Sequence, residues 1–111
     1  MNMASTADHE ILIRLEEGKH AILPNPMPAM KVGETVRYLS YDGQVTMRFP
    51  DLSPFRQDDQ RNTEISGAEP QQLLRAGKFD SRCFLMLQGG MMVGWDPNGS
   101  PQSGGVHDVG H

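Results

Sequence analysis

The chain has 111 residues, which is enough for one domain with one hydrophobic core. Its formal net charge of −4 and isoelectric point near 5.4 argue against a nucleic-acid binder that relies on bulk electrostatics. No apolar run approaches the roughly 20 residues that cross a bilayer, so the sequence predicts no membrane span.

The first 28 residues predict a frayed end, two short strands and a proline-rich connection. Residues 1–9 are polar, and we expect them to be flexible. Residues 11–15 and 20–23 are typical of short strands on either side of a turn. Residues 24–28 contain three prolines, which remove ladder donors, so this segment is expected to run extended along a sheet edge.

Residues 30–51 hold two alternating runs on either side of Asp42-Gly43. Asp-Gly readily supplies the positive φ angles of a two-residue type I′ turn. With that loop, Tyr38 faces Met47, and one face of the hairpin collects the apolar side chains of Val36, Tyr38, Val45, Met47 and Phe49. The pattern therefore predicts a β-hairpin with one buried side.

The second half of the chain predicts a surface loop followed by more short strands. Residues 50–61 are polar and indicate a loop. The expected strands are residues 62–66, 71–75 (or a brief helix), 79–87 and 91–95. Gly89-Gly90 is expected to form a two-residue turn that sets Leu87 opposite Met92.

The composition changes near the C-terminal end. After Asp96 the chain is rich in Pro, Gly, Ser and Asn, which predicts a turn and then a flexible tail. The expected organisation is a flexible segment over residues 1–9, a sandwich over 10–97 and a flexible tail over 98–111. Six to eight short strands with regular turns indicate an all-β, single-domain sandwich.

Four segments resemble the cupredoxin-like family, the Greek-key sandwiches that include plastocyanin and azurin. Residues 30–43 and 45–55 are similar to the first strands of that family. Residues 76–83 are similar to the strand that delivers its copper-binding cysteine, and residues 91–94 to the segment that holds its axial methionine. The resemblance covers residues 11–97 and implies a Greek-key β-sandwich.

The copper ligands of that family are only half present. A blue-copper centre needs two imidazoles, a thiolate and a long thioether contact. The family takes its histidines from loops that correspond here to residues 40–45 and 84–89, and neither contains a histidine. We therefore expect no type-1 copper site and no cofactor. The alternative is a copper-binding or electron-transfer protein that uses Cys83 with Met91 or Met92 and a histidine from a terminal segment.

Cys83 is the single cysteine, so no intrachain disulfide is possible, and this weakly favours a reducing compartment. Strand alternation places Cys83 on one apolar face with Leu85 and Leu87. The sequence therefore predicts a buried, slowly reacting thiol near Met92 or Trp95 without a bound metal. His107 and His111 have the i, i+4 spacing that would let two histidines of a helix bind a transition metal. The glycines around them disfavour a helix, so the sequence predicts a disordered tail here.

In the predicted hairpin Arg37 and Arg48 face each other on the polar side. Like charges directly opposite are unfavourable, so two interpretations are open. A neighbouring carboxylate such as Glu34 supplies the counter-charge, which is the simpler interpretation. In the other, the two arginines contact an anion or a partner protein.

The leading functional hypothesis is a non-catalytic interaction or accessory module, because the sequence offers no catalytic constellation that can be placed. The expected partner is another protein, and a homodimer formed by edge-strand pairing is an alternative. Without a basic and apolar leader at residues 1–10, the expected location is the cytoplasm, or the periplasm if the chain is a trimmed mature form.

Overall fold

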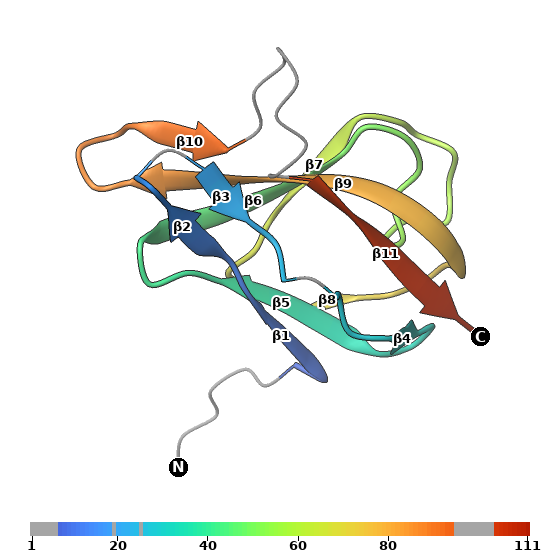
Figure 1. Ribbon diagram of the computed structural model, residues 1–111. Helices are drawn as coiled ribbons and strands as arrows, with labels where there is room; N and C mark the ends of the chain where they lie inside the picture. Colours follow the sequence, from blue (N-terminus) through green and yellow to red (C-terminus); the bar gives the residue numbers. More distant parts are fainter. Residues whose placement is uncertain (1–6, 19, 25, 95–103) are drawn as a thin grey trace.

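Eleven β-strands and no helix make up the described part of the computed structural model, which covers residues 7–18, 20–24, 26–94 and 104–111 (Figure 1). Within these residues no helix is long and apolar enough to cross a membrane. The strands in chain order are β1 (His9–Leu12), β2 (Arg14–Glu16), β3 (His20–Ile22), β4 (Met30–Lys31), β5 (Thr35–Leu39), β6 (Gly43–Phe49), β7 (Thr63–Ser66), β8 (Gln71–Gln72), β9 (Gly77–Leu87), β10 (Met92–Gly94) and β11 (Gly104–Gly110).

The strands form a sandwich of two layers. The larger sheet has the order β4-β11-β9-β6-β7, and β10 pairs with the far half of β9. The smaller layer contains the sheet β1-β5-β8, in which β1 and β5 are parallel, and the two-stranded sheet β2-β3 (Figure 1). The prediction of an all-β, single-domain sandwich is confirmed. Its Greek-key connections and its kinship with cupredoxins stay predictions.

The first predicted hairpin is wrong in its pairing. β5 pairs with β1 and β8, whereas β6 pairs with β9 and β7 in the other sheet. The five predicted inward residues are nevertheless all buried: Val36, Tyr38, Val45, Met47 and Phe49. Two strands that face each other across a core show the same alternation as two strands that share a sheet, so the pattern gave the burial correctly and the partner incorrectly.

Gly43 has a different role from the one that the turn prediction gave it. It is not among the positive-φ residues, and it pairs with Leu87 at the start of β6. A Cβ atom at this position would lie 2.2 Å from the carbonyl oxygen of Met86. Gly43 therefore allows β9 to approach the backbone of β6, which a larger residue would prevent.

The second predicted hairpin forms, but its register is shifted by one residue. Met92 lies opposite Met86 rather than Leu87. The N–H of Leu87 donates to the carbonyl of Met91 over 2.8 Å, so the loop has three residues, and Gly89 and Gly90 in it both have positive φ. A glycine pair is compatible with two-residue and three-residue loops, so it does not fix the register.

The expected flexible tail is also wrong for the part that the structure describes. Residues 104–110 form β11, which lies between β4 and β9 and runs antiparallel to β9. His107 and Val109 are buried there. His107 therefore lies in a strand, neither in a helix nor in a disordered tail, and His111 directly follows that strand. Residues 98–103 lie outside the described residues. At the other end, the expected flexibility of residues 1–9 does not extend to Asp8, whose carboxylate accepts a hydrogen bond from the Thr35 N–H over 2.9 Å.

Other expectations hold more closely. The predicted strands at 62–66 and 79–87 correspond to β7 and β9, and the predicted turn after residue 15 joins β2 to β3. The alternative helix at 71–75 does not form, because residues 71–72 are strand β8. Residues 50–61 are a loop as predicted, yet it contributes the buried Ser53, Pro54 and Phe55 to the core.

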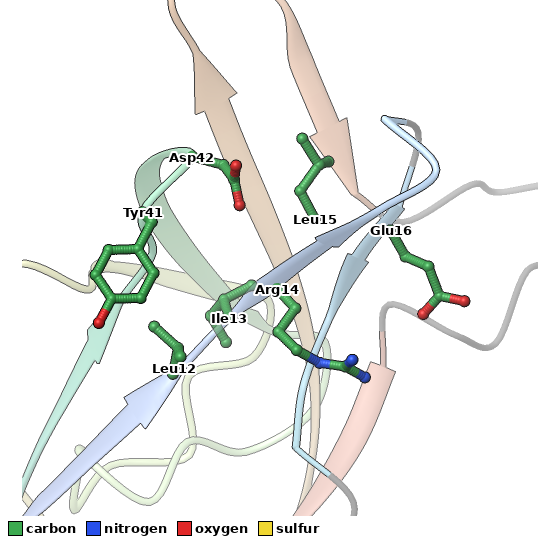
Figure 2. A pocket seen from close by; sticks show the side chains of 7 residues that line it. All are labelled: Leu12, Ile13, Arg14, Leu15, Glu16, Tyr41 and Asp42. Carbon is green, nitrogen blue, oxygen red and sulfur yellow. The ribbon is translucent and has the colours of Figure 1, made fainter.

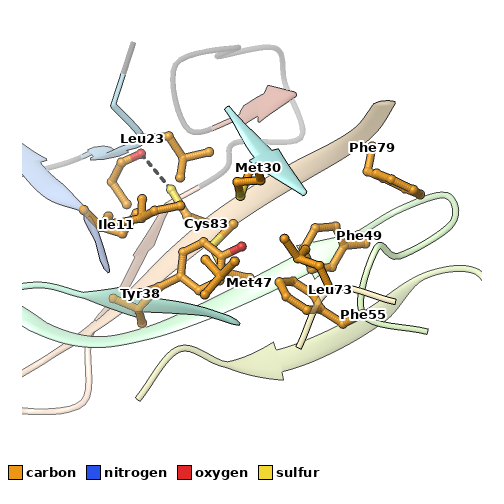
Figure 3. Close-up of a cluster of buried hydrophobic side chains, with 14 of the residues drawn as sticks. Ile11, Leu23, Met30, Tyr38, Met47, Phe49, Phe55, Leu73, Phe79 and Cys83 are labelled. Atoms are coloured by element: carbon orange, nitrogen blue, oxygen red, sulfur yellow. Dashed lines mark hydrogen bonds between the residues drawn. The ribbon is translucent and has the colours of Figure 1, made fainter. Parts of the chain in front are cut away.

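The core lies between the two sheets (Figure 3). Tyr38 comes from β5 in the smaller layer, whereas Met47 and Phe49 come from β6 in the larger one. The ring of Phe55, from the loop, packs edge-on against Phe49 with centroids 5.6 Å apart. Burial of these side chains is the main stabilising contribution expected for a sandwich of this size.

Candidate functional site

One polar pair is buried inside the core. His107 on β11 and Tyr38 on β5 are almost completely inaccessible, and their Nε2 and hydroxyl oxygen are 2.7 Å apart. The ring of Phe49 packs against the imidazole with centroids 5.5 Å apart. Burial lowers the pKa of His107 to about 4 and raises the pKa of Tyr38. The pair links the two sheets, and burial keeps both groups in their neutral forms.

Cys83 lies on the inward face of β9, as predicted. It has 0% exposure, and its thiol donates to the Ala21 carbonyl over 3.4 Å. Burial raises the pKa of Cys83 to about 12. The predicted neighbour Trp95 lies outside the described residues.

The structure does not bring Cys83 together with the methionines of the copper alternative. Met92 lies opposite Met86, and both are exposed, so their side chains are on the outer face of the sheet. Cys83 is on the inner face, so the sheet separates it from Met92. Met91 is exposed in the loop before β10. Within the described residues, no group of three or more His, Cys, Asp or Glu is placed to hold a metal ion.

The predicted juxtaposition of Arg37 and Arg48 is wrong, because β5 and β6 lie in different sheets. Arg37 forms an ion pair with Glu10 of β1, with 3.6 Å between Nε and Oε2. Arg48 lies opposite Arg82 of β9, and its Nε donates to Asn62 over 2.6 Å. The simpler interpretation, a counter-charge from a neighbouring strand, therefore fits Arg37, although the partner is Glu10 rather than Glu34.

The polar loop at residues 50–61 is held by its own ion pairs. Arg56 donates to both carboxylate oxygens of Asp58, which lowers the pKa of Asp58. Arg75 donates to Asp59 over 2.8 Å, and Arg61 pairs with Asp51. These charges are matched by two ion pairs inside the loop and one to Arg75 outside it.

A hollow forms where two paired strands separate. β1 and β5 run parallel up to Leu39, whose carbonyl accepts from the Ile13 N–H over 2.7 Å. Beyond this point the chain of β2 turns toward β3, and residues 40–42 turn toward β6 in the other sheet. The divergence leaves a groove of about 380 Å³, which we call the Tyr41 groove, lined by Leu12, Ile13, Arg14, Leu15, Glu16, Tyr41 and Asp42 (Figure 2).

Tyr41 is the most exposed hydrophobic residue of the groove. It is 93% exposed, and Leu12, which also lines the groove, is exposed too. The turn that carries Tyr41 is fixed by a hydrogen bond of 3.1 Å from the Asp42 N–H to the Ser40 hydroxyl. In Figure 2 the ring of Tyr41 lies on the side of Leu12, and Arg14 extends away from it.

A second hollow lies on the other side of the same turn. It measures about 600 Å³ and shares Leu15, Tyr41 and Asp42 with the Tyr41 groove, while Leu87 and Gln88 close its far side. The Tyr41 turn therefore stands between two hollows at the end of the sandwich where the β9-β10 loop also lies. The sequence signal that points to Tyr41 is an aromatic residue directly before Asp42-Gly43, inside a turn.

No protein-family model matches the chain, and no curated protein is significantly similar to it.

Proposed function

We propose that the chain is a non-catalytic interaction module and that the Tyr41 end of the sandwich is its docking surface for another protein. The observation that carries the proposal is the almost fully exposed ring of Tyr41 standing between two hollows. Tyrosine is enriched at the energetic centres of protein interfaces, because it buries a large area with few rotatable bonds.

The neighbouring apolar side chains support this assignment. Leu12, which lines the groove with Tyr41, is exposed on β1, and Leu87 of β9 lines the second hollow. An exposed aromatic ring beside aliphatic side chains is typical of a docking patch.

The buried reactive groups support the non-catalytic part of the proposal. Cys83 and His107 have strongly shifted pKa values, which often mark an active site. Both lie in the closed core between the sheets, where each already has a hydrogen-bond partner. Their shifts follow from burial in packing positions.

Site-specific photo-crosslinking tests the proposal. A benzophenone amino acid replaces Tyr41 in one version of the protein and Glu64, an exposed residue of β7, in the matched control. Extract from cells that produce the protein should give a discrete protein adduct from position 41 and none from position 64. Excess unlabelled wild-type protein should suppress the adduct, whereas excess Tyr41→Ala protein should not.

Two results would count against the docking surface. Equal adducts from both positions would show non-specific contact, and suppression by the Tyr41→Ala protein would show that the ring does not contribute to binding. Turnover of a substrate by the purified chain would refute the non-catalytic assignment.

A further inference from the structure

The side chains of the Tyr41 turn are held in place by their backbone but not by one another. Within the described residues, the Tyr41 ring makes no ring contact or hydrogen bond, and the Asp42 carboxylate makes no ion pair. By contrast, Glu10, on the same layer, is paired with Arg37. Adjacent residues of one turn therefore carry an aromatic ring without a partner and a carboxylate without an ion pair in the described part of the chain.

This pair of groups has a specific chemical complement. A guanidinium group stacks on an aromatic ring and donates two parallel hydrogen bonds to a carboxylate, so Tyr41 and Asp42 together match an arginine side chain. The formal net charge of −4 agrees with a basic ligand. Arg14 and Glu16 also line the groove with opposite charges, and Figure 2 shows both extending away from Tyr41.

The floor of the groove is apolar, which favours a ligand that carries an apolar side chain as well. Ile13 is buried and Leu15 is partly buried below the turn, while Leu12 borders the groove and is exposed. Five of the lining residues are consecutive, from the end of β1 to the end of β2, so an extended segment can lie along them. Its volume of about 380 Å³ falls within the roughly 300–1,000 Å³ of sites that hold small ligands.

Resting on the docking function proposed above, we infer that the Tyr41 groove binds an extended segment of a partner protein with a basic residue, preferably arginine, next to an aliphatic one. The guanidinium stacks on the Tyr41 ring and pairs with the Asp42 carboxylate. The aliphatic side chain lies on Leu12 and Leu15. Such a contact weakens with added salt, because the carboxylate is exposed to solvent.

Peptide selection against the purified 111-residue chain tests the inference. A random heptapeptide library is displayed and selected on wild-type protein, and one enriched peptide is then synthesised in two forms, one with its arginine and one with neutral citrulline. We expect enriched sequences to contain arginine or lysine beside an aliphatic residue. Citrulline should weaken binding at least tenfold, since it keeps the shape of arginine and loses the charge.

Variants of the protein locate the binding site. Tyr41→Ala and Asp42→Asn should each weaken the arginine peptide at least fivefold, and Asp42→Asn should remove most of the difference between arginine and citrulline. Asp108→Asn, which removes an exposed carboxylate of β11, is the matched control and should leave binding unchanged. Circular dichroism of each variant confirms that the fold is retained, which the exposure of these side chains leads us to expect.

The other possible results of the peptide selection distinguish failure of the arginine-binding inference from failure of the docking function. Acidic or uncharged peptides that lose binding in Tyr41→Ala would overturn the basic segment and leave the docking surface intact. Peptides whose binding survives Tyr41→Ala would overturn the groove as the site. A dimer in sedimentation that Tyr41→Ala dissociates would identify a second copy as the occupant and overturn the inference. No enrichment at all would overturn it too, and the crosslinking result at position 41 would then decide the docking function independently.

Discussion

At the scale of single residues, burial in the core determines the hydrogen bonding and protonation of His107 and Cys83. His107 has one hydrogen bond, to Tyr38, and its Nδ1 has no partner among the described residues. Cys83 donates to a carbonyl oxygen and is otherwise surrounded by the core. Each group is kept in its neutral form, and each gives a measurable consequence.

His107 should make the protein less stable as the pH falls. Its pKa is about 4 in the folded state against an ordinary value of 6.5, so the unfolded chain binds a proton first. Its contribution is complete above pH 6.5 and declines as the pH falls from 6.5 to 4, by about 3 kcal/mol in total. Urea unfolding at pH 7 and pH 4.5 should show this loss.

His107→Gln is the comparison for that measurement. Glutamine keeps a polar side chain near Tyr38 and cannot titrate in this range, so the variant is less stable at pH 7 but loses less between the two pH values. Equal losses in wild type and variant would assign the pH dependence to other groups.

The thiol of Cys83 should react slowly in the native protein. Raising its pKa from 9.0 to about 12 lowers the thiolate fraction at neutral pH about a thousandfold, and 0% exposure adds a steric barrier. Labelling with an aromatic disulfide reagent should be at least a hundredfold slower in buffer than in denaturant. The same protein titrated with Cu(II) should develop no thiolate charge-transfer band; rapid native labelling, or such a band, would mean that the thiol is accessible.

At the scale of elements, side-chain alternation identified faces more reliably than partners. Val36 and Phe49 were assigned to the buried side, and both are buried, although their strands belong to different sheets. Gly43 distinguishes a hairpin within one sheet from a connection between two sheets, because its missing side chain lets the β9 backbone come close. That requirement depends on a strand more than thirty residues away, so a local reading of Asp42-Gly43 could not supply it.

β11 escaped prediction for a related reason. Its sequence contains three glycines with His107 and Asp108, residue types that β-strands disfavour when judged alone. It becomes a strand because β4 and β9 both supply ladder partners, so tertiary pairing outweighs propensity. The candidate site was missed in the same way, since the Tyr41 groove exists only where β1 and β5 diverge.

Two valines of β11 provide a matched test of its place in the sheet. Val109 is 3% exposed and Val106 is 48% exposed, on the same strand. Val109→Asp should cost about 3 kcal/mol or more, because it buries an unpaired charge, whereas Val106→Asp should cost within about 0.5 kcal/mol. Urea unfolding curves of the two variants measure both values; similar small costs would return residues 104–110 to the flexible tail that their composition suggests.

At the scale of the whole molecule, the pairings join distant parts of the chain. β1 pairs with β5, β5 with β8, and β4 with β11. The two parallel pairs, β1-β5 and β4-β11, each pay the entropy of closing a chain loop before their backbone hydrogen bonds form. The Tyr41 groove is a product of this arrangement, because one wall comes from β1 and β2 and the other from the turn that leads from β5 to β6 in the larger sheet.

We expect this topology to make folding slow. Non-local pairing of this kind places sandwich domains in the millisecond-to-second range. Stopped-flow circular dichroism after dilution from urea should show the main phase in that window, and a double-jump protocol separates any slower proline phase. Full recovery of signal within microseconds would show that local contacts dominate.

The position of β11 also matters while the chain is being synthesised. More than seventy residues separate β4 from the strand beside which it lies, so a ribosome working at 5–20 residues per second needs roughly 4–15 s to deliver one after the other. Throughout that interval β4 lacks its ladder partner, and the edge of β9 lacks it over the last stretch, after residue 87 has been added. Until β11 is made, these backbone groups are open to pairing with another chain.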